Sequence, residues 1–208
     1  MGAADLGPWA PLTPSEVADL MAGVGGRWWI AGGFALEAFA GRGWREHEDI
    51  DIGVLARDQA AVREHVAEWE PFAADPPGKL RPWRMGEELR EPVHDIWVRR
   101  GPRSAWAFQL MLNPGDDEAL VYRRDPSIRI PWEEALITVD GVSYLAPEVQ
   151  LLFKSKGRRA KDELDLAEVV PLLGRERRMW LAEMLQRTDA GHPWVGLLRS
   201  SAAEGIEG

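Results

Sequence analysis

The sequence predicts an α+β protein in which a small mixed β-sheet, flanked by helices, is followed by a helical C-terminal part. Short runs rich in β-branched and aromatic residues, bounded by glycine and proline, recur over residues 27–144 and are typical of strands. Apolar residues at helical spacing lie between some of these runs and dominate after residue 146. We therefore expect a core over residues 1–145 and a helical subdomain over residues 146–208.

The N-terminal segment begins without a strong pattern. Residues 1–13 are rich in Pro, Gly and Ala, so we expect a loose arm. Ser15 is predicted to cap a helix that ends near Met21, because its hydroxyl oxygen can accept a hydrogen bond from a free N–H at the helix start. The apolar run over residues 27–31 then predicts a short strand.

A glycine pair separates this strand from the next helix. Gly32 and Gly33 interrupt the apolar run and open a predicted helix over residues 34–40. Alternating residues over 48–55 predict a second strand. Apolar residues at helical spacing over 58–69 predict the helix that follows it.

The middle of the chain is less regular. Residues 71–92 contain five prolines and no long period, which predicts a loop with at most a short edge strand. Residues 93–98 and 105–112 predict two strands joined by a turn. Residues 137–144 predict a hairpin, with Asp140-Gly141 at a type I′ turn.

Only helices are predicted after the hairpin. Pro147 suits the first turn of a helix that continues over residues 148–156. Two further helices are predicted over residues 161–173 and 175–186. The tail after Ser200 is expected to fray.

The composition excludes several kinds of site. The chain has no cysteine, so nitrogen and oxygen groups must supply its chemistry. A formal net charge of −9 argues against a nucleic-acid partner and is compatible with a cationic substrate or with simple solubility. No apolar stretch approaches the ~20 residues that cross a bilayer, and the N-terminus lacks a secretory pattern. We expect a cytoplasmic protein with no membrane partner.

The run His47-Glu-Asp49-Ile-Asp51-Ile is the most informative feature for function. On a strand, Asp49 and Asp51 would project from one face, because side chains alternate between faces. Two adjacent carboxylates repel each other unless a cation lies between them. The preceding Gly32 and Gly33 can bring backbone N–H groups close to a phosphate. Together these residues predict a magnesium-nucleotide site.

A third carboxylate is needed for nucleotidyl transfer, to hold a second metal or to accept a proton from the attacking hydroxyl. Asp95 is the best candidate, because it lies mid-strand between apolar residues, where an unpaired aspartate is costly. Asp116 and Asp117 are alternatives, but their Asn-Pro-Gly-Asp-Asp context is simpler to explain as a turn.

The segment from Gly32-Gly33 to Asp49-Ile-Asp51 resembles the core signature of the polymerase β-like nucleotidyltransferase superfamily. It most resembles the small antibiotic-modifying members, the lincosamide nucleotidyltransferases and aminoglycoside 2″-adenylyltransferases. In these, a Gly-Gly turn precedes an Arg-x-His-x-Asp-Ile-Asp element at this spacing. His94-Asp95-Ile96 resembles the strand that bears the third carboxylate. The resemblance implies a nucleotidyltransferase fold.

Two later segments extend the resemblance to roughly residues 27–170, with loop 71–92 unmatched. Residues 146–154 resemble the helix that follows the sheet in the lincosamide group. Residues 161–166 resemble a Lys-Asp-x-x-Asp element of related helical segments.

The resemblance implies roles for the matching positions. Asp49 and Asp51 would bind Mg²⁺, and Asp95 would act as general base and contact a metal. The glycine turn would contact the triphosphate of ATP or another NTP. The phosphates would also have basic neighbours: Arg45, His47 and Lys154.

Structural explanations compete with several of these roles. Asp49 and Asp51 could be a solvated pair at a sheet edge, and Asp95 could pair with Arg99 or Arg100. His47 could only orient the strand entry, and His94 is expected to point away from Asp95. Arg45 and Lys154 could belong to a solvated basic surface.

The leading functional hypothesis is transfer of a nucleoside monophosphate, AMP first, from an NTP to a hydroxyl of a small antibiotic-like molecule. A toxin-type enzyme that modifies tRNA or a protein is an alternative, favoured by the basic cluster over residues 154–161 and opposed by the net charge. A non-catalytic nucleotide-binding protein is a second alternative. The resemblance is also compatible with a homodimer.

Overall fold

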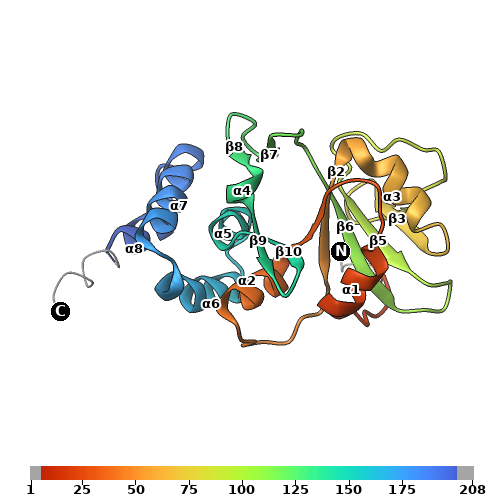
Figure 1. Ribbon diagram of the computed structural model, residues 1–208, viewed down its shortest axis with the longest axis horizontal. Helices are drawn as coiled ribbons and strands as arrows, with labels where there is room; N and C mark the ends of the chain where they lie inside the picture. Colours follow the sequence, from red (N-terminus) through yellow and green to blue (C-terminus); the bar gives the residue numbers. More distant parts are fainter. Residues whose placement is uncertain (1–5, 201–208) are drawn as a thin grey trace.

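The computed structural model describes residues 6–200, and in it one eight-stranded mixed sheet carries helices at its side and at one end (Figure 1). The strand order is β4-β3-β5-β6-β2-β1-β10-β9. Strand β2 pairs in parallel with β6, and β1 with β10, whereas the other pairs are antiparallel. The predicted α+β class and mixed sheet are therefore confirmed.

The strands of the large sheet are short, and a two-stranded sheet, β7-β8, lies beside them. Their bounds are β1 Trp28–Ile30, β2 Asp51–Leu55, β3 Glu70–Ala74, β4 Leu80–Pro82, β5 Asp95–Arg99, β6 Trp106–Asn113, β7 Ala119–Val121, β8 Arg129–Pro131, β9 Leu136–Val139 and β10 Val142–Leu145.

The helices of the C-terminal part of the chain lie together. Helices α5 to α8 gather at the left of Figure 1, away from strands β3, β5 and β6 at the right. The bounds are α1 Pro14–Met21, α2 Gly32–Ala40, α3 Gln59–His65, α4 Trp132–Ala135, α5 Pro147–Lys154, α6 Ala160–Val169, α7 Arg175–Thr188 and α8 Trp194–Ser200, with single 3₁₀ turns at η1 Ala56–Asp58 and η2 Val170–Leu172. No helix in this part of the chain is both long and apolar enough to cross a membrane.

Local sequence signals account for several element ends. Gly41 ends α2 in the left-handed conformation (φ 69°), directly after the helix predicted over residues 34–40. Asp140 and Gly141 both have positive φ, 50° and 80°, as a type I′ turn requires. Pro147 occupies the first turn of α5, where its missing N–H costs nothing.

The start of the chain differs from the expectation. Residues 6–13 are not loose, because Ala10 and Leu12 donate backbone hydrogen bonds of 2.9 Å to the carbonyls of Trp106 and Ala107. Residues 1–5 and 201–208, including the predicted frayed tail, lie outside the described residues. The α1 cap is Thr13 and not Ser15: Thr13 and Glu16 form a capping box in which each side chain bonds the other's N–H.

Two other predictions are wrong in part. The proline-rich segment 71–92 contributes strands β3 and β4, because β3 pairs with β5 inside the sheet. The strand predicted over 48–55 begins only at Asp51, where its pairing with Gln109 of β6 starts. Asp49 therefore precedes the strand.

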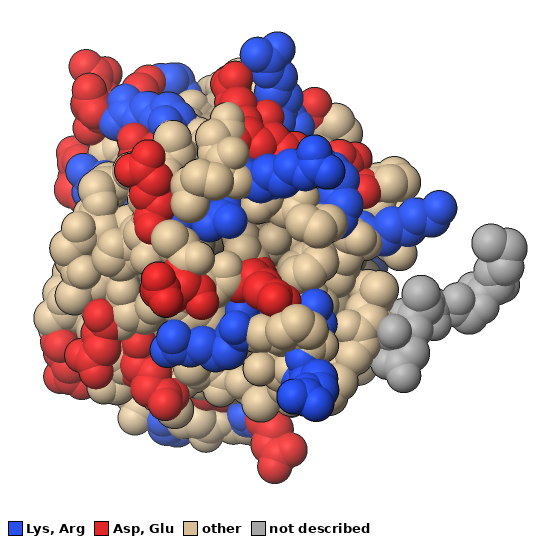
Figure 2. Space-filling view, turned by 90° about the vertical axis from the view of Figure 1, so that its right-hand side faces the viewer, with Lys and Arg blue, Asp and Glu red and all other residues tan. Residues whose placement is uncertain are grey.

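The surface charge is mixed. On the face shown in Figure 2, basic and acidic side chains are interspersed, without a continuous basic track. A duplex or single-stranded nucleic acid requires such a track, so this face gives no support to a nucleic-acid partner.

Candidate active site

Two neighbours of strand β6 bring the predicted aspartates together. Asp51 of β2 pairs with Gln109, and Asp95 of β5 pairs with Met111, two residues further along β6. Residues two apart on a strand share a face, so Asp51 and Asp95 lie on the same face of the sheet. Asp49 joins them at the wall of a cavity of about 220 Å³.

The cavity is polar and is formed by three parts of the chain: the glycine turn, the sheet and the α5–α6 region. Its lining consists of Gly32, Gly33, Arg45, Asp49, Asp51, Asp95, Gln109, Met111, Arg123, Lys154, Arg159 and Lys161. Seven of the eight residues predicted for the site are therefore brought to one cavity, and His47 is the exception.

Negative charge in this cavity is only partly compensated. Burial, together with the charges of Asp49 and Asp95, raises the pKa of Asp51 to about 7 against the opposing effects of Lys154 and Lys161. Asp95 Oδ1 is buried without a hydrogen-bond partner, and its nearest basic neighbour is His94 Nε2 at 3.4 Å. A cation bound here would relieve both costs.

The alternative partners of Asp95 are occupied elsewhere. Arg99 donates to Glu70 at 3.2 Å, and the Arg100 guanidinium lies 3.8 Å from the centre of the Trp69 ring. The prediction that His94 points away from Asp95 is wrong, because the strand begins at Asp95 and leaves His94 in the preceding loop.

Asp116 and Asp117 lie in a turn, as their sequence context indicated. Asp116 accepts hydrogen bonds from the Glu118 and Ala119 N–H groups and from Arg129, and these hold its pKa at about 2. The Asp117 side chain is 90% exposed.

The glycine pair is required by the protein's own side chains. Gly32 has φ +72°, and a Cβ there would lie 2.5 Å from Asp51 Oδ2. A Cβ on Gly33 would lie 2.2 Å from Arg45 Nη2 and from His47 Cε1. The Gly32 N–H donates to Gln150 Oε1 at 2.8 Å, so α5 fixes the turn that faces Asp51.

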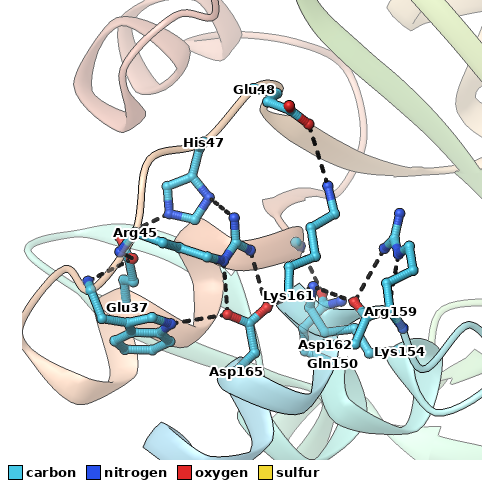
Figure 3. A network of polar contacts seen from close by, with 12 residues as sticks. Glu37, Arg45, His47, Glu48, Gln150, Lys154, Arg159, Lys161, Asp162 and Asp165 are labelled. Carbon is cyan, nitrogen blue, oxygen red and sulfur yellow. Dashed lines mark hydrogen bonds and ion pairs between the residues drawn. The ribbon is translucent and has the colours of Figure 1, made fainter.

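A buried ion-pair network holds Arg45 beside the glycines (Figure 3). Asp165 of α6 accepts from Arg45 Nε at 2.9 Å and from Arg45 Nη2 at 3.0 Å, and Trp44 Nε1 adds a bond of 3.0 Å. Lys154 Nζ lies 2.9 Å from the same carboxylate. Burial alone would raise the pKa of Asp165, but Arg45 and Lys154 outweigh it and hold the pKa at about 2.

Lys154 is a buried cation and not a member of a solvated surface. Its ammonium group also lies 3.3 Å from Asp162, whose other oxygen accepts from Arg159 Nε at 2.9 Å. Asp162 and Asp165 are both fully buried, so α6 supplies two carboxylates that fix the cations at the cavity wall. A lysine held in this way acts on a phosphate as a point charge.

His47 lies behind Arg45. Its Nε2 is 2.9 Å from Glu37 Oε2, its Nδ1 is 3.0 Å from Arg45 Nη1, and its ring packs 4.1 Å from that of Phe34. These contacts orient the loop before β2, in agreement with the structural explanation for this histidine.

Sequence reasoning did not single out several residues of the site. Gln150 and Arg123 carried no signal, because their roles depend on contacts with distant segments. Arg159 and Lys161 lay within the basic cluster that the sequence indicated, and both line the cavity.

The donors present fit a hard divalent ion. Mg²⁺ prefers carboxylate oxygens together with substrate phosphates, and the unpartnered Asp95 oxygen and the raised pKa of Asp51 mark places where a cation would be favourable. Among residues 6–200, no three His, Asp or Glu side chains are close enough to form a complete ligand set by themselves.

A larger cavity of about 460 Å³ continues from the carboxylate cavity and shares Gly32, Asp51, Met111, Arg123, Lys154 and Arg159 with it. Its other walls include an apolar part, with Trp29, Leu145 and Phe153, and the cations Arg124 and Lys156. The combined cleft has a charged end and an apolar end, as a nucleotide requires.

Residues 15–71 match the family model of aminoglycoside-2″-adenylyltransferase. No curated protein sequence matches the chain. Among solved structures, the lincosamide antibiotic adenylyltransferase LnuA, determined with lincomycin bound, aligns with a TM-score of 0.51 and 17% identity over 77% of this chain and 98% of that one. The antibiotic-resistance factor ANT(2″)-Ia aligns with a TM-score of 0.50 and 15% identity, over 91% and 92%.

At these identities the structural matches establish the fold, and the family model covers the segment that carries the glycine turn and two aspartates. The expected resemblance to antibiotic nucleotidyltransferases and the expected nucleotidyltransferase fold are confirmed.

Proposed function

We propose that this protein transfers AMP from ATP, with Mg²⁺, to a hydroxyl group of a small antibiotic-like molecule. One observation carries the proposal: three aspartates from β2, its preceding loop and β5 line one cavity beside a glycine turn. The family resemblance supports nucleotidyl transfer and an antibiotic-like acceptor. We further propose action in the cytoplasm and a boundary near residue 146 between the core and the helical subdomain.

The residues that line the cleft have different roles in the reaction. The cations at the cavity wall, Lys154, Arg159 and Lys161, balance the triphosphate charge. Asp49, Asp51 and Asp95 would hold Mg²⁺ together with the substrate phosphates, which complete its ligands, and the bound ion would neutralise charge on those phosphates. Asp95 accepts the proton of the attacking hydroxyl, whose oxygen bonds to the α-phosphorus while the bond to the β-phosphate oxygen breaks and pyrophosphate leaves.

The basic cluster gives less support to a tRNA or protein acceptor than its sequence suggested. Lys154 and Arg159 pair with buried Asp162, and Arg158 pairs with Glu163 at 2.9 Å. Cations already paired within the protein contribute less to counterion release from a nucleic acid.

The proposal is tested with α-labelled ATP, Mg²⁺ and three acceptor sets in parallel: small hydroxylated molecules, tRNA and protein. Label should pass to a small molecule, and Asp51→Asn should reduce transfer at least ~100-fold, because it removes a charge needed in the transition state. Asp117→Asn, an equal charge change at an exposed turn, is the matched control.

Thermal unfolding separates loss of function from loss of fold. Mg²⁺ with a non-hydrolysable ATP analogue should raise the Tm of the wild type and of Asp117→Asn, but not that of Asp51→Asn. Full transfer by Asp51→Asn would contradict the metal assignment. Nucleotide binding without pyrophosphate release in any acceptor set would favour the non-catalytic alternative.

A further inference from the structure

Three cations line both the nucleotide cleft and a third cavity. This cavity has a volume of about 350 Å³, and His94, which contacts Asp95, is one of the residues that line it. The residues that it shares with the 460 Å³ cavity are Arg123, Arg124 and Lys156. Within residues 6–200, none of the three forms an ion pair.

Each cation is available to a ligand in a different way. Arg123 Nη1 is buried and has no hydrogen-bond partner, and the guanidinium lies 5.8 Å from the Phe153 ring centre. Arg124 uses one nitrogen on neutral oxygens, the Phe153 carbonyl at 2.7 Å and Tyr122 Oη at 3.1 Å. Lys156 is exposed and has no polar contact in the described chain. A buried guanidinium donor without an acceptor is costly unless a ligand completes it.

The position of these cations favours the acceptor over the triphosphate. In the cavity that holds the glycine turn and the aspartates, Lys154, Arg159 and Lys161 are available to the triphosphate. Arg123 also lines that cavity, whereas Arg124 and Lys156 do not. The 350 Å³ cavity contains none of these residues, and Glu91 is its only carboxylate. Asp95 does not line it, but His94 does, and His94 Nε2 lies 3.4 Å from Asp95 Oδ1, so a ligand in this cavity would be close to the proposed general base.

We infer that the acceptor carries an anionic group, a carboxylate or a phosphate, which binds to Arg123, Arg124 and Lys156 while a hydroxyl of the same molecule faces Asp95. This inference rests on the proposed function and assigns the charge of its acceptor. It replaces the cationic acceptor that the net charge of −9 made plausible, because the sign of the cleft wall and not of the whole surface selects a bound group.

The inference predicts binding of small anions to the nucleotide-filled protein. The protein, saturated with Mg²⁺ and a non-hydrolysable ATP analogue, is titrated by ligand-observed NMR with glucuronate, glucose 6-phosphate, glucose and glucosamine. At least one anionic sugar should bind about tenfold more tightly than glucose, since a charge-assisted hydrogen bond contributes roughly that factor. Comparison of glucuronate with glucose 6-phosphate distinguishes a carboxylate from a phosphate.

Substitution of the two exposed cations tests whether they bind the anionic group of the sugar. Arg124→Gln and Lys156→Gln should each weaken the anionic sugar about tenfold and leave the affinity for the ATP analogue unchanged. Lys79→Gln removes the same charge from an exposed site away from the cleft and should change neither affinity. Both cleft side chains are exposed, so these variants are expected to fold.

A separate titration with Mg²⁺ and the ATP analogue, before any sugar is added, tests the proposed function independently. If the analogue binds but glucosamine binds more tightly than both anions, or neither anion binds, the assignment of acceptor charge is overturned. It is also overturned if the anions compete with the analogue, or if Arg124→Gln and Lys156→Gln weaken the analogue, because the cations would then belong to the triphosphate.

Discussion

Asp165→Asn tests whether the buried ion-pair network stabilises the fold and holds the site. The Asp165 side chain is fully buried and accepts hydrogen bonds from Arg45, Lys154 and Trp44. Its pKa of about 2 lies below the ordinary value of 3.8. That difference corresponds to about 2 kcal/mol of stability at neutral pH. The substitution also leaves two buried cations undercompensated, so we expect a total loss of about 2–5 kcal/mol.

The pH dependence has a definite sign. A carboxyl group whose pKa is lower in the folded state binds fewer protons when folded, so its contribution is complete above the unfolded pKa and is lost as pH falls toward the folded pKa. For Asp165 this range runs from 3.8 down to about 2. Roughly 1 kcal/mol should be lost by pH 3.

Urea unfolding followed by tryptophan fluorescence at pH 7 and pH 3 measures both effects. The stability difference between wild type and Asp165→Asn should be large at pH 7 and smaller at pH 3. Asp117→Asn, which removes an exposed carboxylate paired with Arg57, should unfold like the wild type. An unchanged midpoint for Asp165→Asn at pH 7, or a difference that grows as pH falls, would refute the reasoning.

Two further predictions concern local geometry. Gly33→Ala should lower the free energy of unfolding by about 1–3 kcal/mol and reduce nucleotide affinity, because its Cβ would overlap Arg45. The control Gly196→Ala, at an open helix position, should be neutral or stabilising. Calorimetric Tm values and titrations with the ATP analogue compare the two variants. Thr13→Ala should lower the free energy of unfolding by about 1 kcal/mol because it removes the helix cap. Ser15→Ala should have little effect in the same urea unfolding experiment. Equal losses of stability would show that the capping box does not determine this helix start.

The element types and the chemical character of the site could be predicted from the sequence because they depend on local patterns. The ends of α2 and of the β9–β10 hairpin follow from glycines and an aspartate that tolerate positive φ. Asp49 and Asp51 were recognised together because they are two residues apart and follow a glycine pair. Asp95 was singled out because a lone aspartate in an apolar strand is costly without a partner.

The convergence of these groups was decided by tertiary structure. Strand β6 lies between β2 and β5, and this long-range pairing brings Asp51 and Asp95 to the same face. Arg45 meets Asp165 across 120 positions of sequence, and Gly32 meets Gln150 across 118. Local patterns constrain neighbours within a turn or a strand, but they do not specify which distant segment supplies a partner. Likewise, only the fold shows that Arg123 Nη1 is buried without a hydrogen-bond partner.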